Sequence, residues 1–298
     1  MALSENLRGS LWMTAAMAGF AVEDMSLKAA AESLPLGEVL ALFGLLGLAA
    51  FAVMTRRQGS PVWTRGYLGR TLLIRSGFEA MGRLFYALAF VLTPLTVASA
   101  ILQAAPLVVV AGAALFLGER VGWRRWSAVA VGFAGVLLIL RPGVAGWDAL
   151  SLLAVAGMVG FAGRDIATRA APPALTNMQL GVAGFAILAL VGAGLALVEG
   201  HPAFPGPAAA ALIAAAGAAG VAAYFALTVA MRTGDVGAVT PFRYTRLIFA
   251  MILGMAVFGE RPDLLTWAGS LLVVGSGTFA LLRARRPAPL DIRASGSI

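Results

Sequence analysis

Long apolar runs, separated by short polar or glycine- and proline-containing segments, dominate the pattern of hydrophobic and polar positions along the chain. A helix that crosses a bilayer needs about 20 mostly apolar residues. Ten runs approach this length, so the pattern predicts ten transmembrane helices. They cover residues 9–30, 37–54, 70–92, 94–117, 126–141, 148–169, 176–198, 207–231, 238–258 and 264–282.

Composition and charge placement agree with a membrane protein. Of the 298 residues, 60% are hydrophobic and only 12% are charged, whereas soluble domains carry about 25% charged residues. The net charge of +8 does not indicate nucleic-acid binding, because the arginines gather in short segments between apolar runs. Cytoplasmic loops of membrane proteins have this bias. It predicts a multi-pass protein of the cell inner membrane with both termini in the cytoplasm.

An internal repeat relates the two halves of the chain. Residues 118–120 and 259–261 both read Gly-Glu-Arg, and the same offset of 141 positions places Asp24 on Asp165. Five spans is an odd number, so the second copy must enter the membrane from the opposite side. We therefore expect an all-α integral membrane protein of two inverted five-helix repeats, in which the first run is not a cleaved signal. The expected boundaries are 1–143, 144–284 and a disordered cytoplasmic tail over 285–298.

Three charged residues spaced by four lie within the expected span 70–92. Arg75, Glu79 and Arg83 share one helical face. A charge inside a span costs about 3 kcal/mol or more unless it is paired or faces a wet cavity. One interpretation is a substrate-binding wall, flanked by Phe78 and Tyr86, where Glu79 meets an ammonium group or a proton and an arginine meets a carboxylate. The alternative is a self-neutralising ladder that docks this helix on its neighbours.

Two further charge clusters are related by the repeat. Asp24 and Lys28 lie late in the first span, and Asp165 and Arg169, with Arg164 beside them, hold the equivalent places in the sixth. Inverted insertion would put the clusters at opposite membrane surfaces, which suggests a pair of gates. The alternative is anchoring at the membrane interface by pairs four residues apart.

Polar and aromatic residues at equivalent positions extend the candidate substrate site. Gln103 and Tyr244 occupy equivalent positions of the repeat, and Pro106 and Pro241 can leave backbone carbonyls free for a ligand. Polar residues that only hold helices together are the alternative. The other residues assigned to the substrate site are Tyr224, Arg243 and Phe20.

Several classes of function are disfavoured by the residues present. The chain has no cysteine, and its one histidine, His201, lies in a proline-rich connector. The glycine-rich runs follow no predicted strand and indicate helix packing rather than a nucleotide-binding loop. We expect no enzyme, cofactor or metal, and a monomer that binds a small-molecule substrate within the lipid bilayer. A structural scaffold protein is the alternative class.

The chain resembles the EamA branch of the drug/metabolite transporter superfamily over about residues 9–282. The ten spans, the repeat and the two Gly-Glu-Arg segments carry the resemblance, and Glu23 and Asp24 look similar to the first span of YddG-type exporters. The resemblance implies secondary export of amino acids, aromatic or other apolar ones among them, and similar small metabolites. Transport would use alternating access through a central cavity. The alternative is a broad exporter of drugs, purines or organic cations with the same fold.

Overall fold

The computed structural model describes residues 5–116, 123–141, 148–169, 174–200, 203–232 and 240–283. Within these ranges the chain is all-helical and has no strand, as predicted. His201 and the expected tail over 285–298 lie outside them. The helices are α1 (Glu5–Ala30), α2 (Leu36–Arg57), η1 (Arg65–Leu68), α3 (Arg70–Leu92), α4 (Leu95–Leu102), α5 (Ala105–Phe116), α6 (Trp123–Leu140), α7 (Ser151–Arg169), α8 (Asn177–Glu199), α9 (Pro207–Arg232), η2 (Thr240–Tyr244), α11 (Thr245–Phe258) and α12 (Leu264–Arg283).

Two of the expected spans are divided into two helical segments. The span 94–117 forms α4 and α5, and the span 238–258 includes η2 and α11. Pro106 is the second residue of α5 and Pro241 the second of η2. A proline has no N–H to continue the backbone hydrogen bonds of the preceding turn. The divisions fall at Gln103 and Tyr244, which the offset of 141 positions relates.

Charges separate the helices into two groups. Among the described residues, four helical stretches are long and apolar enough to cross a bilayer by composition: α2, 151–168 of α7, α8 and 207–227 of α9. Helices α1 and α3 are as long as these but carry several charged residues. Most of the charges near the middle of α3 are buried against other helices. Among the described residues, the long helices that carry charges are therefore not recognised as spans by their composition alone.

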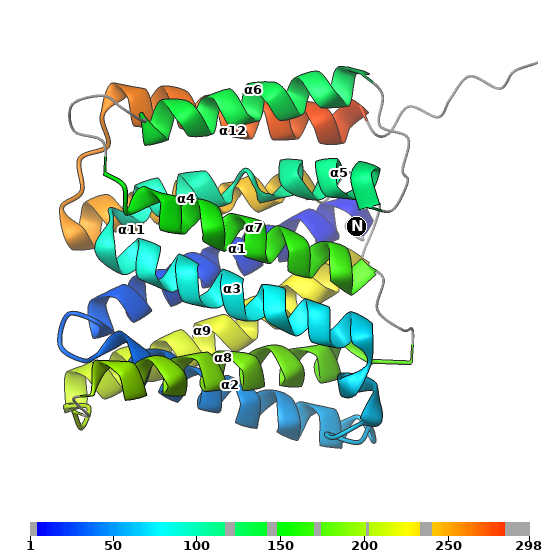
Figure 1. Cartoon of the computed structure of the whole chain (residues 1–298), viewed down its shortest axis with the longest axis vertical. Helices are drawn as coiled ribbons and strands as arrows, with labels where there is room; N and C mark the ends of the chain where they lie inside the picture. The colour runs from blue at the N-terminus through cyan, green and yellow to red at the C-terminus, as the bar shows by residue number, and fades with distance from the viewer. Residues whose placement is uncertain are drawn as a thin grey trace, which may run out of the picture.

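Four pairs of helices pack along their lengths: α1 with α9, α2 with α8, α3 with α7, and α6 with α12 (Figure 1). Close approach between α2 and α8 depends on small residues, as in other membrane bundles. A Cβ atom at Gly44 would overlap the backbone of Ala189, and one at Gly192 would overlap the backbone of Ala41. The expectation that the glycine-rich runs serve helix packing fits Gly192 but not Gly194, which faces open space.

The paired helices α2 and α8 are antiparallel, and so are α6 and α12. The backbone N–H of Gly37, at the start of α2, donates to Oε2 of Glu199, at the end of α8, at 2.9 Å. Arg141, after α6, donates to Asp263, before α12. This hydrogen bond and one from the backbone N–H of Thr266 hold the pKa of Asp263 at about 2.

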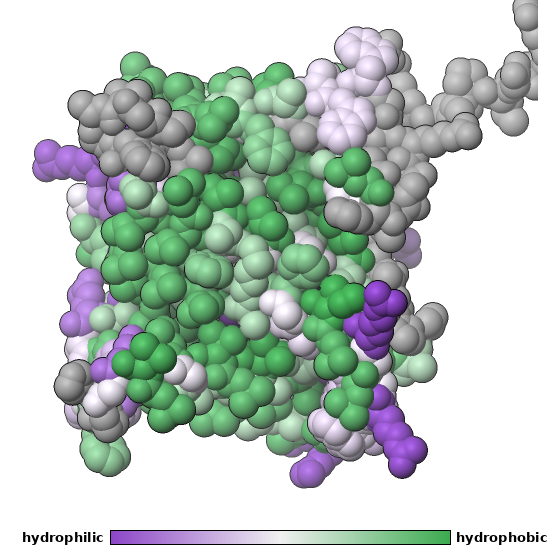
Figure 2. All heavy atoms as spheres, viewed as in Figure 1, coloured by the Kyte–Doolittle hydropathy of each residue, from purple (hydrophilic) through white to green (hydrophobic). Residues whose placement is uncertain are grey.

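Apolar side chains cover the middle of the face seen in Figure 2, and hydrophilic side chains lie toward the two ends of the helices. A groove of about 520 Å³ with an apolar lining lies between α2 and α9. Its lining contains no charged residue: Leu46, Ala50, Met54, Ala214, Gly217, Ala218, Val221, Ala222 and Phe225. The middle of this face and the lining of the groove are thus suited to lipid.

Two neighbouring glycines of α8 test the packing. Gly192→Ala should lower the free energy of unfolding by about 1–3 kcal/mol, because the added methyl group overlaps α2. Gly194→Ala should be neutral or stabilising by up to about 1 kcal/mol, because it gains helix propensity in open space. Unfolding of the purified protein in mixed detergent micelles measures both. Equal effects of the two substitutions would contradict the packing of α8 on α2.

Candidate substrate site

Charged side chains from five elements form one group inside the bundle, which we call the central charge network. It contains five guanidinium groups and four carboxylates, so its net charge is +1 when all are ionised. The members are Glu23 and Asp24 of α1, Arg75, Glu79 and Arg83 of α3, Arg164 and Asp165 of α7, Arg243 of η2 and Arg246 of α11.

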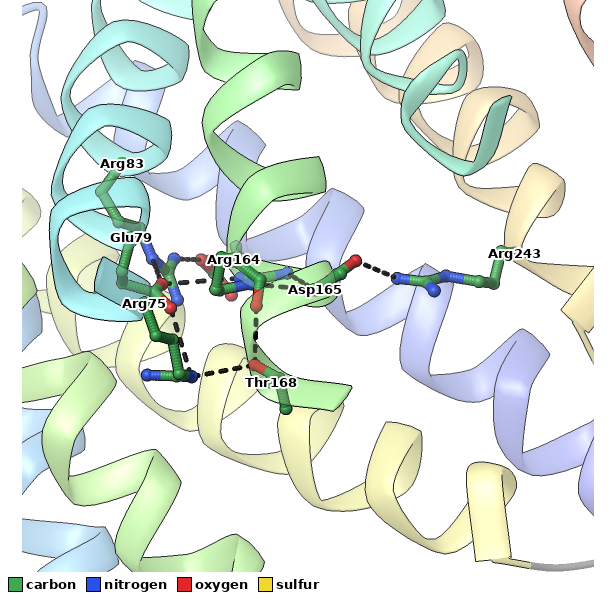
Figure 3. Close-up of polar contacts among 8 residues, drawn as sticks. Arg75, Glu79, Arg83, Arg164, Asp165, Thr168 and Arg243 are labelled. Carbon is green, nitrogen blue, oxygen red and sulfur yellow. Dashed lines mark hydrogen bonds and ion pairs between the residues drawn. The ribbon is translucent and has the colours of Figure 1, made fainter. Parts of the chain in front are cut away.

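Glu79 lies among three arginines of the network (Figure 3). Its side chain is 2% exposed, and its carboxylate oxygens lie 3.0 Å from Arg83, 3.4 Å from Arg75 and 3.5 Å from Arg164. Arg75 and Arg83 reach it because both lie one turn away on the same helix. A buried charge is stabilised only by such pairing. Two of these arginines have a second carboxylate partner, so the surplus of one positive charge belongs to the network as a whole.

Arg75 has hydrogen-bonding capacity that the protein does not use. Its Nε donates to Oγ1 of Thr168 on α7 at 2.9 Å, and its Nη2 faces Glu79. Its Nη1 is buried and makes no hydrogen bond to any described residue. Buried donors without a partner are costly, so this atom is available to a ligand that reaches α3.

The network is most open where α7 meets η2. Arg164 pairs with Asp165 at 2.8 Å, and Asp165 faces Arg243 at the longer distance of 3.8 Å. The side chains of Asp165 and Arg243 are 28% and 31% exposed. The backbone carbonyl of Arg243 accepts a hydrogen bond from Nε2 of Gln103 at 3.0 Å. This loose pair is the part of the network that solvent or a solute reaches first.

A second part of the network joins α1, α3 and α11. Arg246 donates to Oδ2 of Asp24 at 2.6 Å, and the hydroxyl of Tyr86 donates to the same oxygen at 3.1 Å. That hydroxyl also lies 3.3 Å from Oγ of Ser99. Glu23, next to Asp24 in the chain, connects this part to Arg83 at 3.3 Å.

Aromatic rings lie against the guanidinium groups. Arg246 is 5.1 Å from the ring centre of Phe20, and Arg164 is 4.8 Å from that of Phe161. Arg83 lies 5.7 Å from the ring of Phe185. Such contacts stabilise a cation partly removed from water. The site thus combines charged groups with aromatic faces.

The structure brings many of the predicted substrate-site residues together. Phe20, Glu79, Arg83, Tyr86 and Arg243 all belong to the network or contact it. Tyr224 lies against the ring of Phe51 at 5.0 Å and close enough to Arg75 and Glu79 to interact electrostatically. Phe78 instead packs on Gly163 between α3 and α7. Tyr244 is buried, and its hydroxyl has no partner among the described residues.

One side chain connects the two broken spans. Nε2 of Gln103, at the end of α4, donates to the carbonyl of Arg243 near Pro241, and the assignment of Gln103 to the substrate site stays a prediction. The expected central cavity also stays a prediction; in this conformation the charged side chains pack against one another. Mutual pairing explains this, since charges that lie this deep cannot stay apart without water.

The predicted gate residues find partners on other helices. Asp24 and Lys28 do not pair with each other: Asp24 pairs with Arg246, and Lys28 with Glu260. Arg164 and Asp165 do pair with each other within α7. The side chain of Arg169 lies outside the described part of the chain. Anchoring by pairs four residues apart therefore does not account for Asp24 and Lys28.

Sequence reasoning did not assign Arg246, Ser99, Thr168 or Glu260 to a site. Arg246 could have been found, because an arginine within a span that has no carboxylate one turn away must pair with another helix. Ser99 and Thr168 gave no such signal, since hydroxyl groups within spans commonly bond to their own backbone. Within the described residues, no group of three His, Cys, Asp or Glu side chains could hold a metal ion.

The fold and this buried network define a multi-pass membrane transporter. The EamA-like transporter family matches the chain twice, over residues 7–141 and 146–282. The chain belongs to the EamA-like transporter family, and it is a secondary transporter of small molecules rather than an enzyme. The predicted membership of the EamA branch is confirmed.

Similar proteins are named as transporters of different substrates. The chain is 29% identical over 290 residues to a riboflavin transporter of Rhizobium johnstonii, covering 94% of each chain. It is 27% identical over 273 residues to the pseudopaline exporter CntI of Pseudomonas aeruginosa, covering 90% of this chain and 93% of that one. It is 24% identical over 195 residues to an S-adenosylmethionine uptake transporter of Rickettsia felis, covering 65% and 66%. These relatives do not support the narrower likeness to YddG-type exporters.

A solved crystal structure of a protein aligns with this fold. The TM-score is 0.65 at 21% sequence identity, and the alignment covers 93% of this chain and 98% of the other. The likeness extends over nearly the whole bundle and concerns the fold alone.

Substitution of the central carboxylate tests the charge balance. Glu79→Gln should lower the free energy of unfolding by about 3–5 kcal/mol, because the buried Arg75 loses its carboxylate partner and two partly buried arginines each lose one of two. Glu5→Gln, at the exposed start of α1, is the control and should change little. Unfolding in detergent measures both.

A second substitution separates charge from packing. Glu79→Gln combined with Arg75→Gln removes one charge of each sign and should recover part of the lost stability. Equal stability of Glu79→Gln and the unmodified protein would contradict a buried, paired carboxylate at this position.

Proposed function

We propose that the chain exports small zwitterionic metabolites, amino acids among them, by alternating access. The observation that carries the proposal is the loose pair between Asp165 and Arg243 at the accessible edge of the central charge network. A substrate carboxylate can pair with Arg243 while its ammonium group pairs with Asp165. Guanidinium and carboxylate groups form their strongest hydrogen bonds with such charged partners.

Electrostatic exchange explains why a zwitterion suits this pair. Separating Asp165 from Arg243 leaves Arg243 without its carboxylate partner and Asp165 paired with Arg164 alone, and a partly desolvated charge costs free energy until it finds a new partner. A substrate with both signs of charge satisfies both groups, whereas a simple cation or anion satisfies one. The pair can therefore break on substrate binding with little net cost.

The remainder of the network favours a substrate with a carboxylate and an apolar side chain. The network has an excess of one positive charge, and Nη1 of Arg75 is an unused buried donor. The aromatic rings of Phe20 and Phe161 offer faces against which an apolar or aromatic side chain can pack. Aromatic and other apolar amino acids combine these properties.

Contacts between the helices support two inverted halves. The offset of 141 positions exchanges α1 with α7 and α3 with α9, and α1 packs on α9 as α3 packs on α7. The equivalent helices α2 and α8 are antiparallel. Inverted repeats that enclose a site between them are the usual architecture of alternating access.

Exposure of the network supports loading from one side. Asp165 and Arg243 lie toward the end of the molecule where α1 begins, and they are the most exposed members. The excess of arginines in loops at this end supports a cytoplasmic location for it. Substrate binding from the cytoplasm is the first step of export.

A second candidate substrate class is a planar aromatic heterocycle. The riboflavin transporter of Rhizobium johnstonii covers nearly the whole chain at 29% identity. Guanidinium groups that already lie on aromatic rings can also lie on the rings of a heterocycle. Such a substrate would use the aromatic faces rather than the pair between Asp165 and Arg243.

Counterflow into liposomes that contain the purified protein separates the two classes. Labelled phenylalanine and labelled riboflavin are each tested against an excess of the unlabelled compound inside. The proposal expects accumulation of the amino acid. Accumulation of riboflavin alone would favour the second class, and failure of a broad amino-acid panel would contradict the first.

Arg243→Gln should raise the half-saturating amino-acid concentration about tenfold or more, because a hydrogen bond between charged groups contributes about 1.5–3 kcal/mol. Arg57→Gln, at the exposed end of α2, removes an equal charge away from the network and should leave transport unchanged. Initial rates over a concentration series measure both. An unchanged half-saturating concentration for Arg243→Gln would rule out its contact with the substrate.

The absence of natural cysteine allows a direct test of orientation. Ser33→Cys lies in the exposed turn between α1 and α2, and Gln58→Cys directly follows α2. In intact cells, a thiol reagent that cannot cross membranes should label Ser33→Cys. Gln58→Cys should react only after the cells are permeabilised. The reverse pattern would place the termini outside.

A further inference from the structure

Glu260 makes contacts that a residue of a simple turn would not make. It lies between α11 and α12, yet its two carboxylate oxygens accept hydrogen bonds from the first two backbone N–H groups of α4. The distances are 2.6 Å to the nitrogen of Leu95 and 3.0 Å to that of Thr96. Pro94, at the N-cap position of α4, has no side-chain oxygen to accept these bonds. The second half of the chain thus supplies the cap of a helix in the first half.

Lys28 joins the same contact from a third element. Its Nζ, at the end of α1, lies 3.4 Å from Oε1 of Glu260 and donates to the carbonyl of Thr93 at 2.9 Å. It also lies 4.8 Å from the ring centre of Phe258. The side chains of Lys28 and Glu260 are 13% and 9% exposed. The ends of α1 and α11 and the start of α4 are therefore held together by one lysine and one glutamate.

The contact of Glu260 with the start of α4 lies one turn from Ser99, which contacts the central charge network through Tyr86. Thr96, whose N–H it binds, is buried, and one turn further along α4 is Ser99, which is 1% exposed and contacts Tyr86. The same network is exposed at the opposite end, at Asp165 and Arg243. One end of the site is closed while the other is accessible.

We infer that Glu260 is a latch, which closes the α1–α4–α11 end of the transport pathway by binding Lys28 and the start of α4. The inference rests on the proposed alternating access and names the contact that must break when this end opens. Near the surface, water can replace the protein partners of Lys28, Glu260 and the two N–H groups, so the latch can open repeatedly. Water does not reach the buried residues of the central charge network in this way, so it cannot replace their protein partners.

Cysteine labelling tests the latch without a transport assay. Two reporters are placed in separate proteins: Thr96→Cys directly beneath the latch and Ser99→Cys one turn deeper. A charged, water-soluble thiol reagent is added to the purified protein in detergent, and the rate of modification is measured. With the latch intact, both thiols should react slowly, because both positions are buried.

Glu260→Gln should raise the rate at both reporters by about tenfold or more. The amide keeps the size of the side chain, but its NH₂ group cannot accept a hydrogen bond from α4. Lys28→Gln removes the ion pair and the hydrogen bond from Nζ to Thr93 but leaves Glu260 bound to α4, so it should give a smaller increase at both positions. It also serves as the second variant where Glu260→Gln fails to fold.

Glu199→Gln is a matched control. Glu199 likewise accepts a backbone N–H at the start of a helix, that of Gly37 in α2, at the same end of the bundle. It joins α8 to α2 rather than capping α4. Its substitution should leave both labelling rates unchanged.

A faster reaction at Thr96→Cys with no change at Ser99→Cys would overturn the inference, because Glu260 would then be only a local cap of α4. Unchanged rates at both reporters would overturn it as well. Labelling does not depend on the substrate. A faster reaction at both positions in a protein that fails the counterflow test would therefore support the latch and contradict only the proposed substrates.

Discussion

The structure depends on the burial of Glu79 among three arginines. Charges at this depth in a bilayer-embedded bundle are tolerated only where oppositely charged groups or water surround them. Arg75 and Arg83 come from the same helix, but Arg164 comes from α7 and Glu23, the partner of Arg83, from α1. The packing of α1, α3 and α7 is therefore fixed by electrostatics as well as by shape, and the apolar surface is left to face lipid.

The central charge network accounts for the proposed function, and the proposed latch lies at one end of it. Its excess positive charge and its loose pair at Asp165 and Arg243 suit a substrate that carries a carboxylate and an ammonium group. At the other end, Lys28 and Glu260 hold three elements closed by contacts that water can replace. An accessible end and a closed end around one charged site are the arrangement expected of one state in an alternating-access cycle.

Most of the fold could be predicted from the sequence, because hydrophobic length and proline position are local properties. The ten runs follow directly from hydrophobic length. The division of two spans near Gln103 and Tyr244 was not predicted, although Pro106 and Pro241 could have indicated it. Pairing between helices could not be predicted, because it depends on how each helix is rotated in the bundle. Asp24 and Lys28 are four residues apart, yet they face different partners, Arg246 and Glu260. For the same reason the hydrogen bond from Gln103 to the backbone of Arg243 could not be predicted.

Distances between spin labels at the two ends test alternating access most directly. Cysteines replace Glu32 and Leu264 at the closed end in one protein, and Ala174 and Phe242 at the accessible end in another. Pulsed electron resonance in nanodiscs, with and without the substrate selected by counterflow, gives the distance distributions. The account predicts two populations whose weights shift in opposite directions, so that one end widens as the other narrows. Distances that stay fixed at both ends, or that widen together, would contradict it.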